Sequence, residues 1–137
     1  ISNKKNNERL AVASGEIKFD KLTYKKIQSF KTKKGNLEKT AIIGGIIGAK
    51  ETSRLIPLCH NIAINHINIE VKKNDKKFSL IIESTVKTNA KTGVEMEALT
   101  AVTISCLTIY DMCKYLNKRI KIQNIQLVSK TGGKNNI

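Results

Sequence analysis

The 137-residue sequence lacks the features that mark several large classes of protein. Its three cysteines include no C-x-x-C pair, which argues against a disulfide scaffold and fits a reducing, cytoplasmic compartment. The longest uncharged apolar run, residues 41–49, falls far short of the roughly 20 residues that a membrane span requires. The N-terminal residues are mostly polar or charged, so we expect no signal peptide. No second Cys or His lies at metal-ligand spacing from Cys59-His60, so we expect no zinc site.

Acidic residues, arginines and aromatic residues are also scarce. Only 11 Asp plus Glu oppose 25 Lys plus Arg, which gives a formal charge of +14 and predicts attraction for anions. Only three of the basic residues are arginines, the residue type that bidentate phosphate and guanine contacts favour. Aromatic residues make up 4%, few for the stacking face of an RNA-binding sheet. The charge alone leaves open a small phosphate ligand or, as the alternative, a basic α+β RNA-binding module.

The sequence that is present suits one domain, residues 1–137, with a core of its own. We expect helices over residues 20–30, 38–56 and 97–116 and strands over residues 16–19, 62–71, 78–86 and 119–128. Because these elements mix without a strict βαβ alternation, the predicted class is α+β with a largely antiparallel sheet packed with helices. We expect a flexible N-terminal arm over residues 1–9 and a mobile tail over residues 131–137.

Two local irregularities carry further predictions. The apolar alternation changes phase near Asn65-His66, which predicts a β-bulge there. The same change of phase occurs between Ile122 and Ile125 in the last predicted strand. The helix over residues 38–56 contains Gly44, Gly45 and Gly48, each of which costs about 1 kcal/mol of helix propensity relative to Ala. We expect another element or a ligand to approach this helix closely at the glycines.

The helix over residues 97–116 has apolar residues on two opposite stripes. One is an ordinary core face, whereas the other, from Glu97 through Leu107 to Lys114, is apolar in its middle and charged at its ends. A third layer or, preferably, an oligomer would cover it. Glu97 and Asp111 are 14 residues apart, about 21 Å along a continuous helix, so a site that uses both needs a large substrate or a second subunit.

Several polar residues are candidates for chemistry, and each also has an ordinary structural interpretation. Asp111 and Lys114, three residues apart, form either a surface ion pair or an acid–base pair. Glu95 and Glu97 suit the N-terminal end of a helix, and His60 is a proton donor, a phosphate ligand or a structural histidine. Four further lysines lie beside or near glycines, which allow close approach to a phosphate: Lys34, Lys50, Lys130 and Lys134.

Five stretches together resemble one known family over nearly the whole chain. They are Gly45-x-x-Gly-Ala-Lys50, Leu55-Ile-Pro-Leu-Cys-His60, Thr92-Gly-Val-Glu-Met-Glu-Ala-Leu-Thr-Ala101, Leu107-Thr-Ile-Tyr-Asp-Met-Cys-Lys114 and Lys130-Thr-Gly-Gly-Lys134. In order and spacing they are similar to the cyclic pyranopterin monophosphate synthase family of molybdenum cofactor biosynthesis. The resemblance implies a ferredoxin-like α+β fold, assembled as a homohexamer (a trimer of dimers) with active sites between protomers.

The resemblance also implies a reaction. It is the conversion of 3′,8-cyclo-7,8-dihydro-GTP to cyclic pyranopterin monophosphate with release of pyrophosphate, without a metal or an organic cofactor. Asp111 and Lys114 would be the central proton-transfer pair, and Lys34 and Lys50 acid–base or phosphate-contacting lysines. The residues implied in substrate binding are Leu58, Cys59, His60, Glu95, Met96 and Glu97, with Arg9, Lys130 and Lys134 on the triphosphate. The sequence departs from the family pattern at Asn36, Glu51 and Asn61.

Overall fold

The computed structural model describes residues 7–132 and has an α+β architecture, as the sequence predicted. Its elements are β1 (Asn7–Lys18), α1 (Lys21–Ile27), β2 (Lys31–Thr32), β3 (Gly35–Asn36), α2 (Leu37–Lys50), α3 (Thr52–Leu55), β4 (His66–Asn74), β5 (Ser79–Ala90), α4 (Glu95–Cys113) and β6 (Lys121–Thr131). Four strands form an antiparallel sheet in the order β4-β5-β1-β6, and β2 pairs separately with β3. The longer elements follow one another as β1-α2-β4-β5-α4-β6, the ferredoxin-like arrangement.

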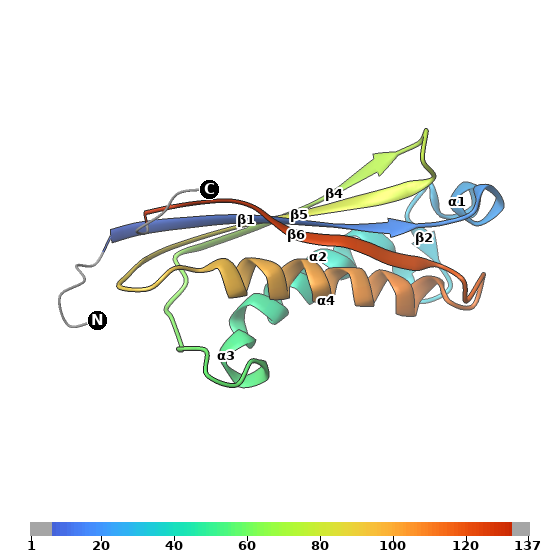
Figure 1. The fold of residues 1–137 in the computed structure, drawn as a ribbon. Coiled ribbons are helices and arrows are strands. Elements are labelled where there is room, and N and C mark those ends of the chain that lie inside the picture. The colour runs from blue at the N-terminus through green and yellow to red at the C-terminus, as the bar shows by residue number, and fades with distance from the viewer. Residues whose placement is uncertain (1–6, 133–137) are drawn as a thin grey trace.

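Both long helices lie against the same face of the sheet, below it in the view of Figure 1. Strand residues that alternate toward this face are buried, among them Ala11, Ala13 and Ile17 of β1 and Leu80 and Ile82 of β5. By length and composition alone, α4 is the one described helix that could cross a membrane. Within the fold, 56% of its apolar window is buried, because α4 packs against the sheet and α2 as the central core helix.

The first strand is much longer than the predicted strand over residues 16–19. Asn7 to Arg9, which we expected in a flexible arm, are the first residues of β1 and pair with Thr88 to Ala90 of β5. The hydrophobic alternation of β1 is weak before Glu16 because, apart from Arg9, the buried positions there hold Ala or Gly. Larger residues would not fit: a Cβ on Gly15 would lie 2.6 Å from Ile125 Cδ1 and 3.1 Å from Cys106 Sγ. At the other end, Thr131 belongs to β6. The remaining residues of the expected arm and tail, 1–6 and 133–137, lie outside the described residues.

One of the two predicted strand irregularities is confirmed. In β6 the register with β1 shifts opposite Ser14 to Glu16, and Asn124 takes a φ of 56°. The prediction of a bulge near Asn65-His66 is wrong, because β4 begins at His66 and pairs with β5 without a break. Ile62 and Ile64 pack against the core from the connection that precedes β4, which explains their apolar alternation without a strand.

The glycines of α2 provide the close approach that their positions predicted. A Cβ on Gly44 would lie 2.6 Å from Thr108 Oγ1, and one on Gly48 would lie 2.8 Å from Ile104 Cγ1. Small residues on α2 therefore let it pack tightly on α4, and this contact covers part of the second apolar stripe of α4. The predicted helix over residues 38–56 is interrupted at Glu51, which separates α2 from the short α3.

Candidate active site

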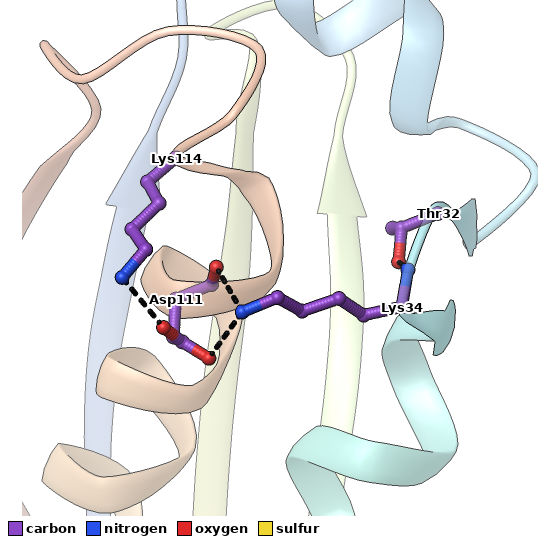
Figure 2. A network of polar contacts seen from close by, with 4 residues as sticks. All are labelled: Thr32, Lys34, Asp111 and Lys114. Atoms are coloured by element: carbon purple, nitrogen blue, oxygen red, sulfur yellow. Dashed lines mark hydrogen bonds and ion pairs between the residues drawn. The ribbon is translucent and has the colours of Figure 1, made fainter.

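A carboxylate held between two lysines lies at the C-terminal end of α4 (Figure 2). Asp111 Oδ2 is 3.0 Å from Lys34 Nζ, and Asp111 Oδ1 is 2.9 Å from Lys114 Nζ. We call Lys34, Asp111 and Lys114 the Asp111 cluster. All three side chains are about half exposed, so the cluster is open to a ligand. The cluster joins residues 77 positions apart in the chain, which the sequence pattern alone did not bring together.

Lys34 reaches Asp111 because a tight hairpin presents it toward α4. Strands β2 and β3 pair Thr32 with Gly35, and Gly35 has a φ of 123°, which favours glycine. The Thr32 hydroxyl donates to the carbonyl of Gly35 at 2.9 Å and accepts from the backbone N–H of Lys34 at 3.2 Å. Asn36 then caps α2, its Oδ1 accepting from the N–H of Lys39 at 2.8 Å. The departure from the family pattern at Asn36 therefore preserves a helix cap.

The two lysines set the protonation states of the cluster. Hydrogen bonds and charge attraction from Lys114 and Lys34 hold the pKa of Asp111 below its usual value of 3.8. The same pairing with Asp111 raises the pKa of Lys114 above 10.5. A carboxylate in the last turns of a helix opposes the helix dipole, so the cations offset an unfavourable position. The cluster holds the carboxyl and amine groups that acid–base chemistry uses, but the ion pairs of this chain shift the pKa values of Asp111 and Lys114 away from neutrality, so a bound substrate would have to weaken these pairs before a proton moves.

A pocket of about 280 Å³ lies at the opposite end of α4, between the N-terminal turn of the helix and the connection after α3. We call it the Glu97 pocket. It brings together all six residues that the resemblance placed in substrate binding apart from the triphosphate contacts. Its lining residues are Ile56, Leu58, Cys59, His60, Ile62, Thr92, Gly93, Glu95, Met96 and Glu97. The sequence interpretation missed Thr92 and Gly93, although both belong to a quoted motif and directly precede α4.

Glu97 is the unusual residue of this pocket. Its side chain is 3% exposed, and Oε1 has no hydrogen-bond partner among the described residues. Burial, with a smaller contribution from the charge of Glu95, raises the pKa of Glu97 above 4.5. Burial and the same two carboxylates raise the pKa of the Cys59 thiol above 9.0. A buried acid without a protein partner is energetically costly, and such a group is typical of a binding site, where a ligand can satisfy it.

Two cations from other strands approach the rim of the pocket. Lys130 Nζ of β6 lies 3.6 Å from Glu95 Oε2. Arg9 of β1 is 6% exposed and donates from Nε to the carbonyl of Ala90 at 3.1 Å and from Nη2 to that of Lys91 at 2.9 Å. Arg9 thus supports the loop that leads into α4, in addition to any contact with phosphate. Lys134, the third expected phosphate ligand, lies outside the described residues.

Lys50 belongs to neither group. It lies at the C-terminal end of α2 and lines a separate hollow of about 270 Å³ with Ile46, Ile64, Asn65, His66 and Ile67. The next residue, Glu51, is 3.9 Å from Arg54 Nε, so the carboxylate that departs from the family pattern has a cation of its own. Asn61 lies exposed in the connection that precedes β4. The described candidate residues therefore form two groups at the two ends of α4, with Lys50 apart from both.

Leu58 has the most exposed large apolar side chain of the pocket lining and a φ of 52°. The left-handed region is unfavourable for a leucine, so the loop holds this residue outward at a conformational cost. Exposed apolar side chains also lie on the outer surfaces of the helices, at Ile43 and Ile47 of α2, Leu55 of α3 and Leu107 of α4. Several exposed large apolar side chains on neighbouring helices offer surface that another protein can cover.

Similar proteins identify the family of the chain. The sequence model of the MoaC family matches residues 1–133. Proteins named cyclic pyranopterin monophosphate synthase from Helicobacter pylori (strain Shi470), Syntrophomonas wolfei and Clostridium acetobutylicum are 48%, 46% and 46% identical to the chain over 134 residues. Each alignment covers 98% of this chain, and 85%, 85% and 83% of the respective relatives. On the match to its model and on these relatives, the chain belongs to the MoaC family.

Proposed function

We propose that the protein is a lyase that converts 3′,8-cyclo-7,8-dihydro-GTP to cyclic pyranopterin monophosphate and pyrophosphate in molybdenum cofactor biosynthesis. The observation that carries the proposal is the Asp111 cluster, in which a carboxylate lies 3.0 Å and 2.9 Å from two lysine amines. The family relationship adds the substrate class, since the relatives are named for this product. The reaction opens and recloses purine-derived rings, which requires several proton transfers near neutral pH.

The charges of the cluster suit this chemistry. As the cyclic phosphate closes, an oxygen–phosphorus bond forms at the α-phosphorus, and the bond to the departing pyrophosphate breaks. Lys34 and Lys114 can stabilise the negative charge that develops on the phosphates, and Asp111 can accept and return a proton between them. Lys50 would add an acid–base or phosphate contact. Lys130, Lys134 and Arg9 would hold the triphosphate, and we expect the reaction to require neither a metal nor an organic cofactor.

The Glu97 pocket would bind the ring system of the substrate. Its apolar lining from Ile56 and Ile62 suits a flat heterocycle, and the unpartnered Oε1 of Glu97 offers a hydrogen-bonding group that a ring nitrogen can satisfy. Cys59, His60 and Met96 complete the binding surface. In this assignment the ring binds against the buried Glu97 carboxyl, and the proton-transfer groups approach from the Asp111 cluster.

One chain does not bring these two halves together. Glu97 and Asp111 are 14 residues apart on the continuous α4, about 21 Å along the helix axis. We propose that the Asp111 cluster of one chain faces the Glu97 pocket of another, in a homohexamer built as a trimer of dimers. The exposed side chains of Ile43, Ile47 and Leu107, together with Leu58 beside the pocket, supply apolar surface for such contacts. We place the enzyme in the cytoplasm.

The test is direct. Purified protein is incubated with the cyclised dihydro-GTP, and cyclic pyranopterin and pyrophosphate are measured together. Equal amounts of both products support the proposal. A salt titration of RNA binding on filters is run beside it, because a steep salt dependence with RNA and no turnover would favour the RNA-binding alternative. Absence of both products from correctly folded oligomer would indicate an assembly subunit without catalytic activity and would overturn the proposal.

The assignment of Asp111 needs a matched variant. Asp111→Asn keeps the size of the side chain but removes the base and one of the two oxygen acceptors, so kcat should fall by about 10²–10⁴-fold. Glu70→Gln is a suitable control, since Glu70 is a carboxylate that pairs with a lysine, Lys72, at 3.3 Å on β4. Normal turnover by Asp111→Asn would refute the role of this residue.

A further inference from the structure

The hairpin that carries Lys34 is too small to hold its own position. Strands β2 and β3 contain two residues each, and an isolated two-stranded hairpin is at best marginally stable in water. Its four tip residues, Thr32 to Gly35, are exposed or half-buried, so packing does not fix them. The bonds of Thr32 shape the turn internally but do not tie it to α4 (Figure 2). The base of the hairpin is attached to α2 through the Asn36 cap and the bond of the Leu37 N–H to the Phe30 carbonyl at 2.7 Å, so a contact at the tip must orient Lys34 toward Asp111.

Tyr115 provides that contact from the end of α4. Its hydroxyl oxygen accepts from the backbone N–H of Lys33 at 3.1 Å, and the Lys33 Nζ lies 5.6 Å from the centre of the same ring. Within residues 7–132, this is the one hydrogen bond that joins the hairpin backbone to the segment around Lys114. Tyr115 is adjacent to Lys114 in sequence, just as Lys33 is adjacent to Lys34.

We propose that Tyr115 is a positioning residue, which fixes the β2–β3 hairpin on the end of α4 so that Lys34 reaches Asp111. The two adjacent residue pairs, Lys33-Lys34 and Lys114-Tyr115, form two parallel links between the hairpin and the helix. One link is the backbone bond of Lys33 to Tyr115, and the other is the Asp111 cluster itself. Neither the family resemblance nor the sequence pattern assigned Tyr115 a role. The catalytic consequence rests on the proposed function, whereas the structural link does not.

The consequence is electrostatic. Among the described residues, Lys34 and Lys114 are the two cations in direct contact with the Asp111 carboxylate, and both lower its pKa. Without the Tyr115 bond, the exposed Lys34 side chain occupies its position beside Asp111 for less of the time, because a mobile hairpin loses more entropy when the ion pair forms. Asp111 would then titrate closer to 3.8. Proton transfer would also be slower, since the reacting groups would be aligned less often.

The test replaces Tyr115 by Phe, which removes the hydroxyl and keeps the ring. The Asp111 carboxyl is titrated by carbon NMR in the substrate-free oligomer, and kcat and KM are measured separately. We expect the Asp111 midpoint to move up and kcat to fall about three- to tenfold, as the loss of one neutral hydrogen bond permits. Tyr110→Phe is the matched control, because it removes a hydroxyl on α4 that donates to the Lys118 carbonyl at 2.9 Å. It should not move the Asp111 midpoint.

A second comparison shows whether Tyr115 acts through Lys34. In a Lys34→Gln background, Tyr115→Phe should produce no further shift of the Asp111 midpoint, because the cation that it positions is gone. An unchanged midpoint in Tyr115→Phe, or an equal shift with and without Lys34, would overturn the inference. The midpoint is measured without substrate, so that result is distinct from a failure of the proposed function, which would show as an inactive wild-type protein with a normal shift.

Discussion

Replacing Glu97 by Gln should make the protein more stable near neutral pH while it impairs the proposed substrate pocket. Glu97 is 3% exposed, and its Oε1 has no partner in the described fold. Burial raises its pKa above 4.5, so the folded protein binds this proton more tightly than the unfolded chain does. The stability that the protonated acid provides is fully present below the unfolded pKa and is lost as the pH rises. Gln stays neutral at every pH and avoids that loss.

The size of the effect follows from the buried charge alone, since the Gln amide is also polar and removes only the extra cost of ionisation, which is on the order of 1–3 kcal/mol. For a domain of this length, about 1 kcal/mol shifts Tm by about 3–4 °C, so Glu97→Gln should raise Tm by about 3–12 °C at pH 8. At pH 4 both proteins carry a neutral side chain and the gain should nearly vanish. Thermal unfolding followed by circular dichroism at both pH values, at one protein concentration, measures the difference.

Glu95→Gln serves as the matched control. Glu95 lies two residues before Glu97, at the rim of the same pocket, and pairs with Lys130 at 3.6 Å. Loss of the Glu95 charge should therefore bring no stabilisation. An increase in Tm that is equal for the two variants, or equal at pH 4 and pH 8, would refute the account of Glu97 as a buried acid without a partner. A stabilised variant with weakened substrate binding would fit a group kept for function at the expense of stability.

Three further predictions concern the cluster and its supports. Asp111 should titrate below 3.8 in a carbon NMR experiment. Its ion pairs should therefore contribute to the stability of the fold above the unfolded pKa, and this contribution should be lost only as the pH falls through the lowered pKa. A midpoint at or above 3.8 would contradict the contacts with Lys34 and Lys114. Gly48→Ala should lower Tm by about 3–6 °C, because the new Cβ would lie 2.8 Å from Ile104 Cγ1 and 3.3 Å from the carbonyl of Thr100, and an unchanged Tm would disprove the tight packing of α2 on α4. Asn36→Ala should lower the unfolding free energy in urea by about 1 kcal/mol through loss of the α2 cap, whereas Asn36→Asp should keep it; equal losses would show that the cap is unimportant.

Much of the fold could be predicted from local pattern, because apolar periodicity and glycine spacing are local. The long helix, the hairpin of β4 and β5 and the close approach at Gly44 and Gly48 follow from it. The part of β1 before Glu16 could not, because apart from Arg9 its buried positions hold Ala or Gly, which are small enough to fit beneath α4 and give no hydrophobic alternation. The predicted start of β4 was wrong for the opposite reason. Ile62 and Ile64 are apolar because they pack against the core from a loop, although they belong to no strand.

In the candidate site, too, contacts between residues close in sequence could be predicted and contacts between distant segments could not. Glu95, Met96 and Glu97 are consecutive, so their shared location was visible in the sequence, and the distance between Glu97 and Asp111 already required more than one chain or a large substrate. The contact of Lys34 with Asp111 depends on how a short hairpin folds against a distant helix end. The orientation of that hairpin by Tyr115 depends on one hydrogen bond, which no periodicity records.

The measurement that tests the central claim most directly is complementation between two inactive variants. Asp111→Asn disables the cluster, and His60→Ala disables the pocket, at opposite ends of one chain. If the two halves of a site come from different chains, random pairing places half of the chains in mixed dimers with one intact site of two, which restores about a quarter of wild-type turnover. We predict that recovery when the two proteins are unfolded and refolded together. Mixed oligomers that form but remain as inactive as either parent would contradict a site shared between chains.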